Sequence, residues 1–145
     1  MQKELVKVWM TKNVVTANAN TTLPEAHQIM MDNNIRRLPI VEKDGRLSGI
    51  VTLGDVRGAQ PSEATSLSVW EMNYLLANLK LNKIMTPDPL TIGPDATIGE
   101  AARLMLENKI SGLPVVDAKG KLLGIITESD IFSMVVLHEW EEVYA

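Results

Sequence analysis

Two stretches of the chain share one pattern of apolar and polar positions. IRRLPIVEKDGRLSGIVTLGD at 35–55 and ISGLPVVDAKGKLLGIITESD at 110–130 each contain two short apolar runs around a turn that ends in glycine. Short apolar runs on either side of such a turn are typical of a β-hairpin. Each stretch ends in Thr-x-x-Asp, where we expect the second strand to end and a helix to begin.

The similarity extends beyond the two hairpins. When the chain is shifted by 75 positions, residues 8–59 align with 83–134 without a gap, and 18 of these 52 positions are identical. Unrelated sequences of average composition would agree at about one position in fifteen. The chain therefore contains an internal duplication, and any fold assignment has to account for it.

Upstream of its hairpin, each repeat predicts a short strand and then a helix. The strand falls at 14–16 in the first repeat and at 90–92 in the second. The helix begins with Thr-x-x-Glu at 22–25 and at 97–100. This is the spacing of a capping box, in which the threonine hydroxyl and the glutamate carboxylate each accept a backbone N–H of the first helical turn.

Behind each predicted cap, apolar residues recur at the spacing of a buried helical stripe. Asn33 and Asn108 stand where the two helices should stop. Each repeat is therefore predicted to be a β-α-β-β-α unit in a mixed α/β (α+β) fold. A unit of about fifty residues is marginal for folding alone, so we expect the two pseudo-symmetric repeats to pack face to face.

The predicted elements divide the chain into four parts. The first repeat covers 1–59, a linker 60–80, the second repeat 81–134 and a helical tail 135–145. In the linker, Ser68…Glu71 again has capping-box spacing and predicts an inserted helix of about three turns. Aromatic residues of the linker and tail either cover the core, which we favour, or form a partner surface; they are Trp70, Tyr74, Trp140 and Tyr144.

Composition limits the classes of function. The chain is 46% hydrophobic and 22% charged, as in globular proteins, and it has no cysteine, which fits a reducing compartment. No apolar run approaches the roughly 20 residues that span a bilayer, and no signal peptide is visible. The formal charge is −4, and no basic cluster exceeds Arg36-Arg37. We therefore expect a soluble cytoplasmic protein that binds neither nucleic acid nor membrane.

The Thr-x-x-Asp pairs, Thr52…Asp55 and Thr127…Asp130, are the candidates for chemistry. A helix N-terminus favours a phosphate, and a threonine hydroxyl there can donate to a phosphate oxygen. An ionised aspartate only accepts hydrogen bonds and suits a pair of ribose hydroxyls. Apolar neighbours at 35–39 could hold a flat base between them. The same pattern is also a variant capping box, so the pairs could simply start two helices.

No catalytic or metal-binding pattern competes with these pairs. His27 and His138 each stand alone without the spacing of a second ligand, so a structural role is expected for both. The nucleophile-elbow, zinc-protease and Walker patterns are absent. We therefore expect no enzyme activity, no metal and no required cofactor.

In the order and recurrence of its motifs, the chain resembles a tandem pair of CBS domains, the Bateman module. The motifs that carry the resemblance are Trp9-Met10-Thr11 and Ile84-Met85-Thr86, the Leu-Pro strands, the glycine turns, and GIVTLGD and GIITESD. They cover nearly the whole chain except the linker helix and the tail. The resemblance implies a regulatory module that binds AMP, ADP, ATP or a related adenosyl ligand in clefts between the repeats. It also implies disc-like homodimers.

The resemblance further assigns ribose binding to the two aspartates, phosphate contact to the two threonines, and base binding to main chain at the first strand and the strand entry. The residues concerned are Thr16, Ile35, Arg36, Arg37, Leu38, Pro39, Thr52 and Asp55 in the first repeat, and Thr91, Ile110, Ser111, Gly112, Leu113, Pro114, Thr127 and Asp130 in the second.

The two repeats differ at the strand entry, where Arg36-Arg37 corresponds to Ser111-Gly112. Guanidinium groups match phosphate oxygens, so the arginines would favour a phosphorylated ligand, unless they are merely solvated charges. The leading hypothesis is a sensor in which nucleotide binding alters the packing of the repeats and an effector protein responds. The alternative is a structural dimerisation module whose clefts are vacant.

Overall fold

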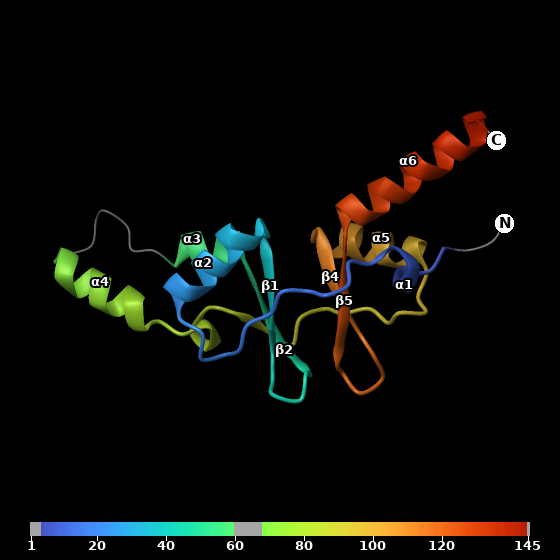
Figure 1. Ribbon diagram of the computed structural model, residues 1–145. Helices are drawn as coiled ribbons and strands as arrows, with labels where there is room; N and C mark the ends of the chain where they lie inside the picture. Colours follow the sequence, from blue (N-terminus) through green and yellow to red (C-terminus); the bar gives the residue numbers. More distant parts are fainter. Residues whose placement is uncertain (1–3, 60–67, 145) are drawn as a thin grey trace. The chain divides into compact units, whose positions relative to one another are not determined.

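The structure is a computed structural model that describes residues 4–59 and 68–144, with side chains as far as residue 139. Its contacts group the chain into two compact units (Figure 1). The central unit is Val15–Pro89, and the terminal unit combines Met1–Val14 with Leu90–Ala145. The first residues of each repeat therefore belong to the unit that is formed mainly by the other repeat.

The central unit is built on a three-stranded antiparallel sheet with the order β1-β2-β3. Its elements are α2 (Leu23–Asn33), β1 (Arg37–Val41), β2 (Leu47–Thr52), α3 (Leu53–Gly58), α4 (Val69–Asn78), the 3-10 turn η1 (Leu81–Lys83) and β3 (Thr86–Pro87). The terminal unit is built on the β4–β5 hairpin; its elements are α1 (Val6–Trp9), α5 (Ile98–Asn108), β4 (Gly112–Val116), β5 (Leu122–Thr127) and α6 (Glu128–Tyr144).

The helix boundaries and hairpins predicted from the sequence are confirmed. Thr97 and Glu100 form a complete capping box, whereas at α2 only the Thr22 hydroxyl accepts from the backbone. The helices α2 and α5 end at Asn33 and Asn108 as expected. The glycines of the two hairpin turns have φ values of +88° and +82°, which only glycine adopts without strain.

The short leading strand of each repeat is the exception. The structure has a single parallel bridge at Ala17 with Ile40, and another at Ile92 with Val115, instead of a strand. The pairing with β1 ends directly after Ala17. There the Asn18 side-chain oxygen accepts the backbone N–H of Asn20 at 2.9 Å and closes a turn. In place of the short strands predicted at 14–16 and 90–92, each unit therefore has one bridged residue, Ala17 or Ile92.

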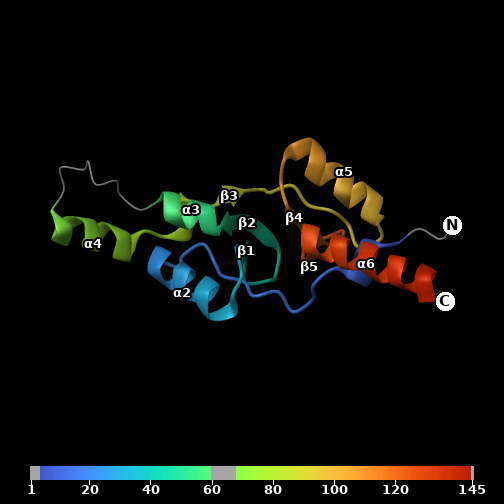
Figure 2. The same cartoon turned by 90° about the horizontal axis from the view of Figure 1, so that it is seen from above.

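A separate apolar core stabilises each unit. In the central unit, the buried side chains of α2, β1, β2 and α3 meet Leu81 of η1. In the terminal unit, α1 and α5 pack on the β4–β5 hairpin, and α5 also contacts α6 (Figure 2). The equivalent helix residues Met30 and Met105 lie at the centre of these cores. The duplicated apolar stripe is therefore the reason why both units bury the same helix face.

The N-terminal segment is bonded to the rest of the terminal unit at several places, including β5 and α6. Thr11 exchanges backbone hydrogen bonds with Ile125 of β5, at 2.8 and 3.0 Å. Before it, the Trp9 indole N–H donates to a Glu4 carboxylate oxygen at 2.8 Å, and the other Glu4 oxygen lies 2.8 Å from Nε2 of His138 on α6. His138 thus has the structural role expected of it.

The close approach of this segment requires a glycine on β5. A Cβ added at Gly124 would lie 2.6 Å from the carbonyl oxygen of Thr11 and 2.9 Å from the sulfur of Met10. The corresponding Gly49 on β2 faces Met85 and Thr86, whose sulfur and carbonyl oxygen would lie at 2.6 and 3.0 Å. The same Met-Thr pair therefore lies against the same Gly-Ile pair in both units.

We predict that Gly124→Ala destabilises the protein by about 1–3 kcal/mol, because the added methyl overlaps the Thr11 carbonyl oxygen, which accepts the Ile125 backbone N–H at 3.0 Å. Gly49→Ala should destabilise less, because the nearest atom there is the flexible Met85 sulfur. Urea unfolding followed by circular dichroism measures both changes.

Gly99→Ala is the matched control, since its nearest neighbour would be the Thr97 hydroxyl oxygen at 3.8 Å. Alanine in a helix is favoured over glycine by up to about 1 kcal/mol, so this variant should be at least as stable as the wild type. Equal unfolding midpoints for Gly124→Ala and Gly99→Ala would contradict the close approach.

Candidate functional site

In the central unit, the candidate site begins where β2 ends and α3 starts. The Thr52 backbone N–H donates to Oδ2 of Asp55 at 2.8 Å, and the Asp55 backbone N–H donates to the Thr52 hydroxyl oxygen at 3.1 Å. This is a complete capping box, so the structural interpretation of the pair is confirmed. One carboxylate oxygen remains: within the described residues, no donor bonds Oδ1 of the half-buried Asp55.

In the terminal unit, the equivalent pair lies between β5 and α6 and is bonded more extensively. The Thr127 backbone N–H and hydroxyl donate to Oδ2 of Asp130 at 2.9 and 3.2 Å. The Thr11 hydroxyl donates to Oδ1 of Asp130 at 3.3 Å. Both oxygens of Asp130 therefore have a partner within the protein.

The strand entry lies beside each helix start. The first amide of α3, from Leu53, donates to the Arg36 carbonyl at 2.8 Å, and in the terminal unit Glu128 donates to the Ser111 carbonyl at 3.0 Å. The hairpin registers place Arg37 opposite Thr52, and Gly112 opposite Thr127. The structure thus brings together the strand entry and the Thr-x-x-Asp pair that the sequence analysis linked.

Thr16 and Thr91 lie close to the same strands. Each precedes a residue bonded to the middle of the strand: Ala17 donates to the Pro39 carbonyl at 3.1 Å, and Ile92 donates to the Pro114 carbonyl at 3.0 Å. Both threonines are half-buried. The predicted residues of each repeat therefore lie within one unit, along the first strand of the hairpin and at the end of the second.

The side chains of the predicted site residues range from fully buried to exposed. Leu38 and Leu113 are fully buried in the two cores, so only their main chain is available to a ligand. Ile35 and Ile110 pack against the cores but remain half-exposed. Arg36 is exposed. The idea that Leu38 holds a base with its side chain is wrong, because that side chain is part of the core.

The turn at the far end of the β1–β2 hairpin contains an ion-paired arginine. Arg46 lies 2.8 Å from Asp44 and 2.9 Å from Glu42. The hydrogen bond and negative charge of Asp44, together with the charge of Glu42, raise the pKa of Arg46. The guanidinium group of Arg46 is thus bonded by two carboxylates of the same turn.

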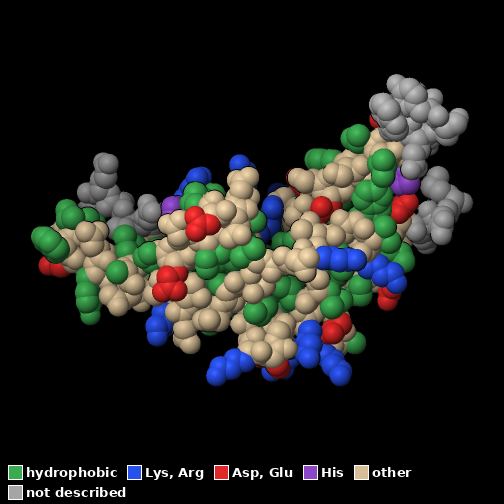
Figure 3. Space-filling model, in the orientation of Figure 1, with side chains coloured by type: hydrophobic (Ala, Val, Ile, Leu, Met, Phe, Trp, Pro, Cys, Tyr) green, Lys and Arg blue, Asp and Glu red, His purple; other side chains and the backbone are tan. Residues whose placement is uncertain are grey.

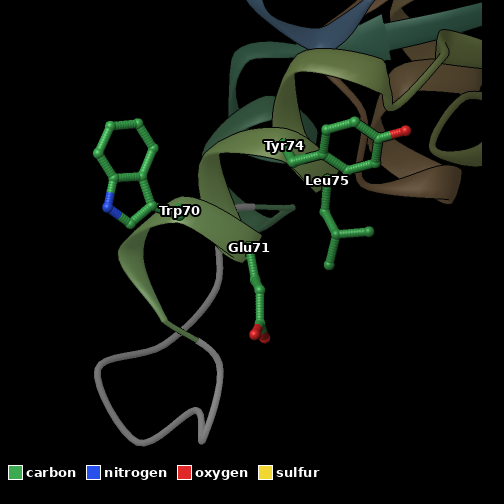
Figure 4. A pocket seen from close by; sticks show the side chains of 4 residues that line it. All are labelled: Trp70, Glu71, Tyr74 and Leu75. Carbon is green, nitrogen blue, oxygen red and sulfur yellow. The ribbon is translucent and has the colours of Figure 1, made fainter.

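The linker helix α4 presents an apolar surface (Figure 3). Trp70 and Tyr74 are 85% and 70% exposed and, with Leu75 and Glu71, line a shallow depression (Figure 4). The interpretation that these aromatic residues cover the core is wrong, because Leu76 and Leu79 make that contact. The side chains of Trp140 and Tyr144 lie outside the described residues.

Thr11 also lies at the candidate site, although it is not among the site residues predicted from the sequence. The available signal was the Met-Thr pair that recurs at 10–11 and 85–86. Its contact with Asp130 spans 119 positions, so no local pattern predicts it.

Among the side chains that the structure describes, in 4–59 and 68–139, no group of three or more His, Asp or Glu is arranged to hold a metal ion. No helix in this part of the chain is both long and apolar enough to cross a membrane.

Comparison with known proteins identifies the family of the chain. The CBS domain profile matches residues 3–62 and 81–137. A CBS domain-containing protein of Dictyostelium discoideum is 39% identical over 134 residues, which are 92% of each chain. Homoserine O-acetyltransferases of methanogenic archaea also match, but a typical alignment, with the Methanosalsum zhilinae enzyme at 35% identity, covers only 23% of that enzyme.

Two solved structures carry the same fold. The CBS domain pair of protein MJ0100, in complex with 5′-methylthioadenosine and S-adenosyl-L-methionine, has a TM-score of 0.77 at 32% identity and covers 92% of this chain and 97% of its own. CBSX2 in complex with AMP, a CBS-pair protein of Arabidopsis thaliana, has a TM-score of 0.78 at 28% identity and covers 94% and 98%. With its duplicated helix–hairpin–helix repeats and their paired Thr-x-x-Asp helix starts, the chain belongs to the CBS domain family.

Proposed function

We propose that this protein is a regulatory module that binds an adenosyl ligand at the Thr-x-x-Asp sites of its two CBS repeats. The observation that carries the proposal is the Asp55 carboxylate, which uses one oxygen to cap α3, while its other oxygen accepts no hydrogen bond from the residues that the structure describes. Complexes of similar CBS pairs with AMP, and with 5′-methylthioadenosine and S-adenosyl-L-methionine, support it.

The ligand class follows from what these compounds share. Each contains an adenine base and a ribose with hydroxyl donors, whereas their 5′ substituents differ in charge. An ionised carboxylate accepts ribose hydroxyls, and backbone groups at the strand entry suit the edge of a base. Thr16 and Thr91 are the main-chain candidates, because each directly precedes the residue that pairs with the first hairpin strand.

Within this class we favour AMP, ADP or ATP. The exposed Arg36 immediately precedes β1 and Arg37 is the first residue of that strand, and guanidinium groups suit phosphate oxygens. The terminal unit has Ser111 and Gly112 at the equivalent positions, and neither residue is positively charged. The site of the central unit is therefore the one we assign to a phosphorylated ligand.

Regulation requires that the ligand bind two conformations of the protein unequally. We propose that occupancy shifts such an equilibrium in a homodimer and that an effector protein recognises the favoured conformation. We propose no catalytic role: similarity to enzymes is confined to about a quarter of their length, as with the Methanosalsum zhilinae enzyme at 23%.

A structural dimerisation module is the second candidate. The complete capping box at Thr52 and Asp55 gives these residues a function without any ligand. Exposed apolar side chains on α6, such as Phe132 at 62% and Val136 at 65%, suit a subunit interface. Ligand titration separates the two candidates.

We predict that Asp55→Asn and Asp130→Asn weaken adenosyl-ligand binding at their own sites by about tenfold or more, as expected for the loss of a charge-assisted hydrogen bond. Asparagine keeps a carbonyl oxygen for the cap but places an amide donor towards the ribose. Isothermal titration calorimetry with AMP, ADP, ATP and S-adenosylmethionine measures both affinity and stoichiometry.

Glu100→Gln is the matched control, because it neutralises the capping carboxylate of α5, which lies at no proposed site. All three variants lose one charge at a helix N-terminus and should lose about 0.3–1 kcal/mol of stability. Equal affinities for wild type and both aspartate variants would contradict a ligand role. Absence of binding by every compound, with nucleotide-free protein, would favour the dimerisation module.

We also predict that Arg36→Ala and Arg37→Ala lower the affinity for ATP by more than that for uncharged 5′-methylthioadenosine. Each lost guanidinium–phosphate contact should weaken ATP binding by roughly tenfold. The Lys43→Ala variant, in the exposed turn of the same hairpin, controls for a general loss of positive charge. A parallel loss for both ligands would show that the arginines do not contact phosphate.

A further inference from the structure

The N-terminal segment brings a hydroxyl group to the candidate site of the terminal unit. Thr11 lies alongside β5, and its backbone exchanges two hydrogen bonds with Ile125 of that strand. Gly124 permits a contact so close that an added Cβ would lie 2.6 Å from the Thr11 carbonyl oxygen. Backbone pairing therefore holds Thr11 against β5.

From this position the Thr11 hydroxyl donates to Oδ1 of Asp130 at 3.3 Å. The opposite carboxylate oxygen accepts from the backbone and the hydroxyl of Thr127. A hydroxyl has one hydrogen and two lone pairs, so the Thr11 oxygen still accepts hydrogen bonds after this donation. Two acceptors, Thr11 Oγ1 and Asp130 Oδ1, thus lie side by side at an exposed edge.

The central unit provides an internal comparison. Thr86 pairs with Ile50 on β2, as Thr11 pairs with Ile125 on β5. Within the described residues, however, Thr86 makes no side-chain bond to Asp55, and Asp55 presents Oδ1 alone. The two backbone arrangements match, so the difference lies in the threonine side chain and its carboxylate.

Two adjacent acceptors match a ligand with two adjacent hydroxyl donors, as in the 2′,3′-diol of ribose. We infer that Thr11 is a specificity-determining residue of the Asp130 site: its hydroxyl accepts from one ribose hydroxyl while Asp130 accepts from the other. The Asp55 site lacks this second acceptor and distinguishes ribose from deoxyribose less strongly. This inference rests on the proposed function.

The test measures binding of AMP, 2′-deoxy-AMP and 3′-deoxy-AMP in the Asp55→Asn background, which isolates the Asp130 site. Thr11→Val removes the hydroxyl but keeps the side-chain shape. We expect it to weaken AMP binding by roughly three- to tenfold, the value of one hydrogen bond, and to reduce the preference for AMP over one deoxy analogue by a similar factor.

Two further variants separate recognition from structure. Thr11→Ser keeps the hydroxyl and should retain the preference for the full ribose, whereas Thr86→Val removes the equivalent hydroxyl of the central unit and should leave the Asp130 site unchanged. A merely structural Thr11 would lower affinity for all three compounds equally, which overturns the inference.

Other outcomes are also decisive. Unchanged or tighter AMP binding by Thr11→Val overturns the inference alone, because it shows that the threonine hydroxyl contributes nothing or competes with the ligand. Failure of every adenosyl compound to bind the wild-type protein overturns the proposed function and this inference with it. The two failures are distinguished by the wild-type titration.

Discussion

The close backbone contact between a Met-Thr segment and a Gly-Ile pair is the constraint on which both units depend. A Cβ at Gly124 would overlap the Thr11 carbonyl oxygen, and one at Gly49 would crowd Met85. Glycine at these two positions allows the incoming segment to pair with the second hairpin strand. Each unit is thereby completed by residues from the start of the other repeat, and neither half of the sequence forms its own unit alone.

The second strand leads directly to the residues that carry the functional argument. At Thr52 the strand ends and the helix begins, and the Asp55 carboxylate uses one oxygen for the cap. A capping role and a binding role are therefore compatible, because a carboxylate has two oxygens and only one is required by the backbone. At Asp130 the second oxygen accepts a hydrogen bond from the Thr11 hydroxyl, so the two repeats differ in the bonding of the equivalent carboxylate oxygen.

The exposed surfaces have a different physical origin. On α4, Leu76 faces the core while Trp70 and Tyr74 face outward. On α6, Ile131 and Met134 contact the core, and Phe132 and Val136 remain exposed. Both helices thus carry more apolar surface than one core can bury. Such surface is typical of proteins that associate with other chains.

Much of this architecture is determined by short-range patterns in the sequence. The spacing of Thr97 and Glu100, the helix stop at Asn108 and the glycine turns predict elements that the structure contains, because caps and turns are formed by residues three or four positions apart. The duplication likewise identified the two equivalent Thr-x-x-Asp pairs. These features need no knowledge of the tertiary fold.

Tertiary structure alone decided which segments complete each unit and what each side chain contacts. The pairing of Thr11 with Ile125 and its bond to Asp130 join residues more than a hundred positions apart, and no periodicity encodes such a contact. The apolar side chain of Leu38 suited either a ligand base or the core, and in the structure it is buried in the core. Tertiary structure also decided that Trp70 is exposed, because a helical stripe does not specify which of its apolar residues meets the core.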